Sequence, residues 1–272
     1  MAKTKVLITV KTYPSISTKY EEIVCTAGMR ENGEWIRIYP VPFRKLPYAQ
    51  QYPKYQWIEM DLAKVKKTKD FRPESYSPEN LDAENLVVFG DKLDTRHKWA
   101  RRKEIVLQNV YTNLSKLIEE AKTKGIYTSL AVFKPTKIKG FTVEKSARDW
   151  NKKQKLSLQK GNLFEDENTF EVVKKLPYKF SYVFEDCNGR EATLMNRDWE
   201  VGALYWNCLK RHNGDEKAAC ADVKYKYWDD FAKTKDLYLF LGTTKAYHKR
   251  APNPFIIIGT FHPPIELQPS LF

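Results

Sequence analysis

Residues 22–39 read EIVCTAGMRENGEWIRIY, and this stretch decides the first part of the fold. Two runs rich in apolar residues flank Glu31-Asn32-Gly33. Asn-Gly readily takes up positive φ, which a tight hairpin turn requires, so the stretch is predicted to form two antiparallel strands. Asn188-Gly189 separates residues 178–185 from 190–195 in the same way and predicts a second hairpin. The sequence therefore predicts sheets that are mainly antiparallel.

The region between the two hairpins carries apolar residues at helical spacing: Val106, Val110, Leu114, Leu117, Ile118 and Ala121. This spacing predicts one long central helix that begins after Thr95 and ends near Lys124, before Gly125. A helical pair is expected near the C-terminus, over residues 198–212 and 215–232, with two closing strands after it. The expected fold class is α+β, with mainly antiparallel sheets.

Residues 145–167 are rich in Lys and Gln and carry few apolar side chains, so they are expected to form a linker rather than a packed element. This predicts an N-terminal α+β domain over 1–144, a basic mobile linker over 145–168 and a C-terminal α+β domain over 169–262. A tail peptide over 263–272 follows Pro263-Pro264.

Composition excludes several classes of protein. The chain has 272 residues, with 47 Lys or Arg and 34 Asp or Glu, which gives a formal net charge of +13. Its 42% of hydrophobic residues suffice for a packed core, which excludes a wholly disordered chain. No run approaches the ~18 apolar residues of a membrane helix, and no secretory signal pattern is evident. The cysteines form no CxxC pair, so a reducing cytoplasm is the expected compartment.

The positive charge is concentrated in one block. Residues 98–160 contain sixteen basic and five acidic side chains, a net of +11. Such a concentration favours a polyanionic partner, with DNA as the first expectation and RNA as the alternative. A solvated lysine-rich face would give the same pattern.

One predicted strand carries an unusual face. Trp35, Arg37 and Tyr39 alternate in sequence and therefore share one side of the strand. Such a face suits stacking on an unpaired base, with Arg on phosphate, whereas the alternative is an outer face on which Arg37 pairs with a carboxylate. The residues expected to contact nucleic acid are Lys11, Tyr13, Trp35, Arg37, Tyr39, Arg44, Arg72, Arg101, Arg102, Lys152, Lys153 and Lys155.

Asp198-Trp199-Glu200 opens a predicted helix directly after the second hairpin. Capping and the helix dipole both favour carboxylates at this position, which explains them structurally. The alternative is that Asp198 and Glu200 are catalytic, as an acid/base pair. Nucleotide-loop and hydrolase motifs such as GxGxxG, GxxxxGK[ST], GxSxG and HExxH are absent from the sequence. Cys208 and His212 share a helix face without further ligands at familiar spacing, so no metal site is predicted, and Mg²⁺ is expected only if the protein is a nuclease.

The run Trp35-Ile36-Arg37-Ile38-Tyr39-Pro40-Val41-Pro42-Phe43-Arg44 resembles the opening of an uncharacterised bacterial protein family of mobile and defence-type gene islands. Further segments over 6–14, 24–28, 176–182, 198–200 and 241–243 are similar to other blocks of that family, so the resemblance covers most of the chain. It implies a setting in DNA processing or phage defence, and it implies no activity and no catalytic residue.

The last five residues, Gln268-Pro269-Ser270-Leu271-Phe272, resemble the pentapeptide by which bacterial DNA-processing proteins bind the sliding clamp. In such peptides Gln fixes the register and the Leu-Phe pair fills an apolar pocket, so the resemblance implies Gln268, Leu271 and Phe272 as clamp-binding residues. Pro269 departs from the Leu of that consensus. The alternative is a tail that packs against its own domain.

The leading hypothesis is a cytoplasmic DNA-associated protein that binds nucleic acid through its basic and aromatic surface and is recruited by the sliding clamp. A first alternative is a DNA-acting enzyme, either a base-excising glycosylase or a nuclease. A second is an RNA-binding or RNA-processing module, and a third is an interaction subunit whose charge is incidental.

Overall fold

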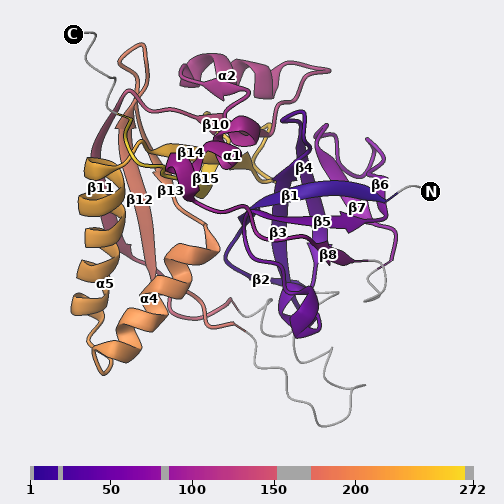
Figure 1. Ribbon diagram of the computed structural model, residues 1–272. Coiled ribbons are helices and arrows are strands. Elements are labelled where there is room, and N and C mark those ends of the chain that lie inside the picture. Colours follow the sequence, from indigo (N-terminus) through magenta and orange to yellow (C-terminus); the bar gives the residue numbers. More distant parts are fainter. Residues whose placement is uncertain (1–2, 18–20, 81–85, 152–172, 267–272) are drawn as a thin grey trace.

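The computed structural model of the protein describes residues 3–17, 21–80, 86–151 and 173–266. Within these ranges the chain forms three β-sheets and several helices, so the α+β fold class predicted from the sequence is confirmed (Figure 1). No helix in the described ranges is long and apolar enough to cross a membrane.

The first sheet curls around the right-hand side of Figure 1 and has the order β6-β7-β4-β3-β1-β5-β8, with β2 paired to β3. Its neighbouring strands run antiparallel except for β4 and β7, which are parallel. Two short 3₁₀ turns, η1 (Phe43–Lys45) and η2 (Tyr48–Gln50), follow β4. The strands are β1 (Thr4–Lys11), β2 (Ser15–Ser17), β3 (Glu21–Met29), β4 (Trp35–Val41), β5 (Gln56–Met60), β6 (Leu62–Lys64), β7 (Ser75–Pro78) and β8 (Val87–Phe89).

Two smaller sheets lie beside the first. One has the order β15-β14-β10-β9 and the other the order β11-β12-β13. Their strands are β9 (Val110–Tyr111), β10 (Leu130–Phe133), β11 (Lys137–Lys145), β12 (Tyr178–Glu185), β13 (Glu191–Met195), β14 (Tyr238–Thr243) and β15 (Phe255–Phe261). The parallel pair β9–β10 makes the second sheet mixed.

The helices are α1 (Arg96–Val106), α2 (Leu114–Lys122), α4 (Trp199–Arg211) and α5 (Glu216–Lys224), which continues as a π-helix, η4 (Tyr225–Ala232). In Figure 1, α4 and α5 lie against the β11–β12–β13 sheet. Aromatic residues of that sheet, such as Phe180 and Tyr182, share a buried cluster with Tyr205 of α4 and Val223 of α5. The helical pair predicted over 198–212 and 215–232 is confirmed.

Strand β1 explains why the first sheet and the sheet of β14 and β15 pack together. Its residues from Val6 to Val10 are all buried, because the strand is covered on both faces. Val6 and Ile8 point into a cluster within the first sheet, whereas Leu7 belongs to a second cluster that contains Phe240 and Phe261. Alternate residues of β1 therefore pack into two different hydrophobic clusters, one on each face of the strand. This accounts for the uninterrupted apolar run in the sequence.

The prediction of one long central helix is wrong. The chain leaves α1 at Val106, forms strand β9 and enters α2 only at Leu114. The Asn113 side chain accepts a hydrogen bond from Lys116 N, and the buried Asp186 carboxylate accepts one from Leu114 N. These caps satisfy the first backbone donors of α2 and outweigh the continuous apolar spacing.

Both predicted hairpins are confirmed. Strands β3 and β4 pair across Asn32-Gly33, and β12 and β13 pair across Asn188-Gly189. Gly33 and Gly189 each have φ of +76°, the conformation for which Asn-Gly was expected.

The predicted domain boundary at 144/145 does not separate two sheets. Strand β11 runs across it to Lys145 and pairs with β12, and β10 pairs with β14 far along the chain. Residues 152–172, most of the predicted linker, lie outside the described residues.

Candidate functional site

A buried cluster of charges lies where the first sheet meets α4. Lys54 Nζ is 2.7 Å from both carboxylate oxygens of Asp198 and 3.0 Å from Oε2 of Glu200. The side chains of Lys54 and Asp198 are 4% and 0% exposed, whereas that of Glu200 is 53% exposed. One ammonium therefore joins a fully buried carboxylate to one that faces solvent.

The backbone brings these groups together from opposite ends of the sequence. Tyr13 N donates to Arg197 O at 2.8 Å, and Thr12 forms a β-bridge with Asp198, so the end of β1 is fixed to the start of α4. The Asp198 carboxylate also caps α4 by accepting from Glu200 N at 3.2 Å. The capping interpretation of Asp198 is thus confirmed, and the same carboxylate has a second partner in Lys54.

The environment shifts the pKa values of the two carboxyl groups in opposite directions. Burial raises the pKa of Asp198 to about 6, although the Lys54 ammonium opposes this rise. Burial would also raise the pKa of Glu200, but Lys54 outweighs it and lowers that pKa below its ordinary value. Burial disfavours the Lys54 ammonium, yet the two carboxylates more than compensate and raise its pKa. Glu200 is therefore held ionised at the surface of the cluster.

Lys54 and Glu200 of this cluster line a pocket of about 310 Å³. Its walls are aromatic and its rim is cationic: the lining residues are Lys11, Pro53, Lys54, Tyr55, Lys92, Trp99, Arg102, Trp199, Glu200, Phe231, Thr260 and His262. The His262 ring stacks on Phe231 with centroids 3.6 Å apart, and Trp99 contacts the His262 ring edge-on at 5.1 Å. The Arg102 guanidinium lies 4.0 Å from the centroid of the Tyr55 ring.

Two polar atoms of the pocket have no hydrogen-bond partner among the described residues. They are Thr260 Oγ1 and His262 Nδ1, both buried. Thr260 is only 2% exposed. Buried polar atoms normally find partners, and both of these atoms belong to residues that line the same pocket.

Backbone strain positions one wall of the pocket. His97, Lys98 and Trp99 have φ of +49°, +53° and +67°, the left-handed region that side chains with a Cβ rarely adopt. The irregular turn directs Trp99 against Phe261 as well as His262. Strain of this kind is found at binding sites, where the surrounding packing holds it in place.

Lys11 lies at the rim of the pocket. Its ammonium donates to Tyr52 O at 3.0 Å and lies 4.2 Å from the centroid of the Phe43 ring. Burial, reinforced by the nearby Lys54, lowers the pKa of Lys11 to about 8. This amine therefore loses its proton more easily than an exposed lysine does.

The carboxylate pair offers no open metal site. The Lys54 ammonium occupies the space between Asp198 and Glu200. Elsewhere in the described ranges, no group of three or more His, Cys, Asp or Glu side chains is arranged to hold a metal ion.

The model of a protein family described as Domain of unknown function (DUF8757) matches residues 110–272. The chain belongs to the DUF8757 family. Residues 2–108 match the model of a second family, described as Domain of unknown function (DUF8758). No curated protein matches the chain. A solved structure of a murine DNA binding protein bound with ds DNA aligns over 100% of both chains at 11% identity, but its TM-score of 0.32 is too low to support an argument.

The pocket is built from both matched regions. Lys11, Lys54 and Trp99 come from the DUF8758 region, and Glu200 and His262 come from the DUF8757 region. The two models meet at residues 108–110, not at the boundary near 145 that the sequence predicted.

Three of the predicted site residues line the pocket: Lys11, Arg102 and Glu200. Asp198 does not line it but contacts the lining residue Lys54. Arg101 is exposed on α1, next to Arg102. Lys152, Lys153, Lys155, Gln268, Leu271 and Phe272 lie outside the described residues.

The predicted Trp35/Arg37/Tyr39 face is not an open surface. Arg37 is 2% exposed and donates to Ser129 Oγ at 2.8 Å and Ser129 O at 3.1 Å. Trp35 packs edge-on against Phe240, and Tyr39 is 46% exposed. The three residues alternate as predicted, but the segment that leads into β10 covers Arg37 through Ser129, which the sequence of one strand does not reveal.

Three other predicted contacts are engaged within the protein. Tyr13 is 5% exposed and accepts from Trp206 Nε1 at 2.7 Å, so the prediction that it extends the ligand surface is wrong. Arg72 is 9% exposed and donates to Thr243 O and to Asp70. Arg44 forms an ion pair with Glu22 at 2.7 Å.

A pH dependence of stability is expected from His262. Burial lowers the pKa of His262 from 6.5 to about 4. Between these two pH values, His262 is therefore protonated in the unfolded chain and neutral in the folded protein. The stabilising contribution of neutral His262 is therefore complete above pH 6.5 and is lost as the pH falls toward 4. The total is about 3 kcal/mol, since each pKa unit corresponds to about 1.36 kcal/mol.

The measurement is the difference in unfolding free energy between the wild type and His262→Phe. Phe keeps the stacking on Phe231 but cannot titrate. From pH 7 to pH 4 the wild type should lose stability relative to the variant. A difference that does not change with pH would show that His262 is protonated as easily in the folded protein as in the unfolded chain.

Proposed function

We propose that this protein binds nucleic acid and that the pocket above Lys54, Asp198 and Glu200 accommodates one unstacked base. The observation that carries the proposal is the aromatic pocket with two orphaned buried polar atoms, Thr260 Oγ1 and His262 Nδ1, on its lining. Aromatic walls suit the faces of a base, and fixed polar atoms suit its edge.

The charges around the pocket favour a nucleotide of a strand over a neutral small molecule. Lys11, Lys92 and Arg102 line it, and the chain as a whole carries a formal charge of +13. Lys92, which is exposed, and the half-buried Lys11 can hold phosphates, whereas Glu200, ionised and half exposed, can accept a hydrogen bond from an exocyclic amino group. A volume of about 310 Å³ lies at the small end of the range for ligand pockets, which fits a single nucleotide base.

A second candidate function is base excision, because Glu200 has the properties of a general base. Its pKa is lowered by Lys54, and its carboxylate faces the pocket. A carboxylate in that state can take a proton from a water that attacks the sugar carbon of a bound nucleotide, while the bond between that carbon and the base nitrogen breaks and the base leaves with the electron pair. Asp198 is fully buried and paired, so its role in this scheme is to position Lys54 and Glu200. Release of free base from modified DNA, lost in Glu200→Gln, would establish this activity.

The finer parts of the sequence hypothesis stay predictions. These are DNA as the partner in preference to RNA, recruitment by the sliding clamp through the tail, cytoplasmic location and a setting in phage defence. Competition between DNA and RNA strands of one sequence tests the first, and binding to purified clamp tests the second.

Thr260→Val tests the pocket directly, because it removes an orphaned hydroxyl and keeps the side-chain shape. Stability should be unchanged or slightly higher, since the buried hydroxyl has no partner in the unliganded protein. Affinity for a single-stranded DNA should fall about 5- to 30-fold, as expected when a hydrogen bond of about 1–2 kcal/mol is lost. Fluorescence anisotropy with a base-containing strand and with an abasic strand of equal length measures the effect, and only the first should weaken.

Thr9→Val is the matched control. Thr9 is also a buried threonine whose hydroxyl has no partner in the described ranges, but it does not line the pocket. It should leave the affinity for both strands unchanged. Equal affinity of the wild type for base-containing and abasic strands would contradict the proposed base pocket.

A further inference from the structure

Three loops that are distant in sequence form a basic surface, which we call the three-loop surface (residues 64–69, 122–127 and 244–252). These segments contain no Asp or Glu. Their nine cations are Lys64, Lys66, Lys67, Lys69, Lys122, Lys124, Lys245, Lys249 and Arg250, and all of them are exposed. Seven of the nine lie outside the block 98–160 that the sequence singled out, because the surface exists only in three dimensions.

The three-loop surface is held together by a buried histidine. His248 is fully buried, and its Nε2 donates to Ala121 O at 2.7 Å, so its Nδ1 accepts from Thr243 Oγ1 at 2.7 Å. Burial lowers the pKa of His248, which keeps the ring neutral in this role. The ring also contacts Phe71, next to the first loop, with centroids 5.0 Å apart.

Further contacts join the loops at their edges. Lys122 Nζ donates to Pro252 O at 2.9 Å, and Lys245 Nζ donates to Lys69 O. The Lys249 ammonium lies 4.2 Å from the centroid of the Phe71 ring and 4.7 Å from that of Tyr127. The cations thus stand on a packed platform, and binding a ligand would order few new groups.

None of the nine cations forms an ion pair with another described residue, whereas many lysines elsewhere are paired. Lys5 pairs with Glu31 at 2.6 Å, Lys139 with Glu191 at 2.6 Å and Lys233 with Asp229 at 2.5 Å. The nearest carboxylate in sequence, Asp70, is engaged by the Arg72 guanidinium. A surface that only keeps a protein soluble usually mixes both signs, so an unpaired cluster of this size indicates an anionic partner.

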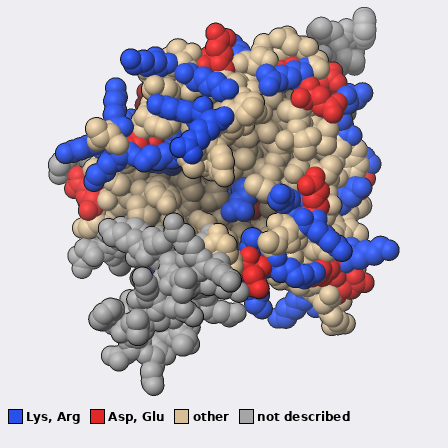
Figure 2. All heavy atoms as spheres, turned by 180° about the vertical axis from the view of Figure 1, so that it is seen from behind, with Lys and Arg blue, Asp and Glu red and all other residues tan. Residues whose placement is uncertain are grey.

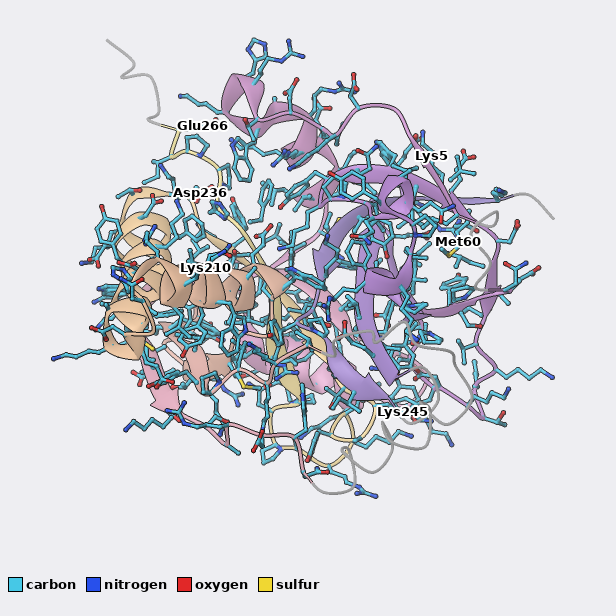
Figure 3. All side chains as sticks on the ribbon, turned by 90° about the horizontal axis from the view of Figure 1, so that it is seen from below. Lys5, Met60, Lys210, Asp236, Lys245 and Glu266 are labelled. Carbon is cyan, nitrogen blue, oxygen red and sulfur yellow. The ribbon has the colours of Figure 1, made fainter. Side chains whose placement is uncertain are left out.

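The views of the molecule agree with this distribution. Figure 2 shows Lys and Arg gathered over the upper left of the face, with few Asp and Glu among them, whereas both signs mix on the right. In Figure 3, Lys245 lies at the opposite edge of the molecule from Asp236 and Glu266.

We propose that the three-loop surface binds the phosphate backbone of a nucleic acid, as a contact separate from the pocket, with which it shares no residue. The inference rests on the proposed function and extends it from one nucleotide to a longer tract. The aromatic rings among the cations favour nucleic acid over a membrane: Tyr247 is 65% exposed and Tyr127 lies under Lys249. Membrane-surface binding typically uses an amphipathic helix, whereas these residues lie mainly on loops.

The test is the salt dependence of binding to a 20-base-pair duplex and to an abasic single strand. The variant Lys67→Gln/Lys124→Gln/Arg250→Gln removes one cation from each loop. The slope of log K against log salt should become shallower by about 2–3 for the duplex, because each lost phosphate contact contributes about 0.9. For the abasic strand the slope should become shallower by about 1–2, because each phosphate contact to a single strand contributes about 0.7.

The control Lys5→Gln/Lys139→Gln/Lys233→Gln removes the same number of charges from lysines that are 41%, 39% and 52% exposed and ion-paired. It should leave both slopes unchanged. Equal slopes for the wild type and the three-loop variant would overturn the inference. It would also be overturned if the wild type bound phosphatidylserine vesicles and the variant did not, while the DNA slopes of the two proteins were the same. A shallower slope together with equal affinity for base-containing and abasic strands would support the three-loop surface and refute only the base pocket.

Discussion

Lys54→Ala is expected to lower the free energy of unfolding by about 3–5 kcal/mol, because it leaves the Asp198 carboxylate buried without its cation. Asp198 is fully buried, and both of its oxygens accept from Lys54 at 2.7 Å. Without Lys54 the pKa of Asp198 should rise above its present value of about 6, so the variant's deficit should be larger at pH 8 than at pH 5. Urea unfolding at the two pH values measures both effects.

Lys134→Ala is the matched control for this change. Lys134 also pairs with an aspartate, Asp236, but the two side chains are 32% and 34% exposed. Exposed pairs contribute little, so the loss should be below about 1 kcal/mol. The double variant Lys54→Met/Asp198→Asn removes both buried charges and should recover much of the stability. Equal losses for Lys54→Ala and Lys134→Ala would show that the buried cluster is no more important to the fold than a surface pair.

Trp99→Ala is expected to weaken binding of a base-containing single strand about 10- to 100-fold, which corresponds to the 1–3 kcal/mol of a lost base stack. Trp99 lines the pocket and contacts His262, so it supplies one of the walls against which a base would lie. The affinity for an abasic strand should change little. Anisotropy is measured at a temperature at which the variant is folded, because Trp99 also packs on Phe261.

Trp228→Ala controls for the general effect of losing a partly buried tryptophan. Trp228 packs against the cluster beneath α4 and α5 and does not line the pocket. It should lower the melting temperature and leave the binding of both strands unaltered. Trp99→Phe keeps an aromatic wall and should restore most of the affinity. If Trp99→Ala weakens both strands equally, the tryptophan supports the fold of the rim and does not stack on a base.

Local chemistry predicted the elements that depend on neighbouring residues. The Asn32-Gly33 and Asn188-Gly189 turns and the Asp198 cap each need only a few consecutive side chains, and each was predicted correctly. The long helix failed because its apolar spacing continues through residues 106–121 while Asn113 and Asp186 cap a new start. Asp186 is distant in sequence, so this competing signal could not be seen locally.

The candidate site was predicted only in part, for the same reason. Asp198 and Glu200 stand out as a pair in sequence, but Lys54, Thr260 and His262 carry no motif and reach the pocket through tertiary packing. Positive charge along the chain pointed to 98–160, whereas the exposed unpaired cations gather from three loops. Burial of Arg37 likewise depends on Ser129, which directly precedes β10 of another sheet.

The Lys54–Asp198 pair also has a consequence for inheritance. Each partner belongs to a different matched region, and each is a buried charge whose ion-pair partner comes from the other region. A recombination event that brought in a neutral residue at position 54 would leave the Asp198 carboxylate buried without its cation, and a neutral residue at position 198 would leave Lys54 paired with Glu200 alone. The two regions can therefore be exchanged between relatives only as a matched set, so residues 54 and 198 should change together or not at all.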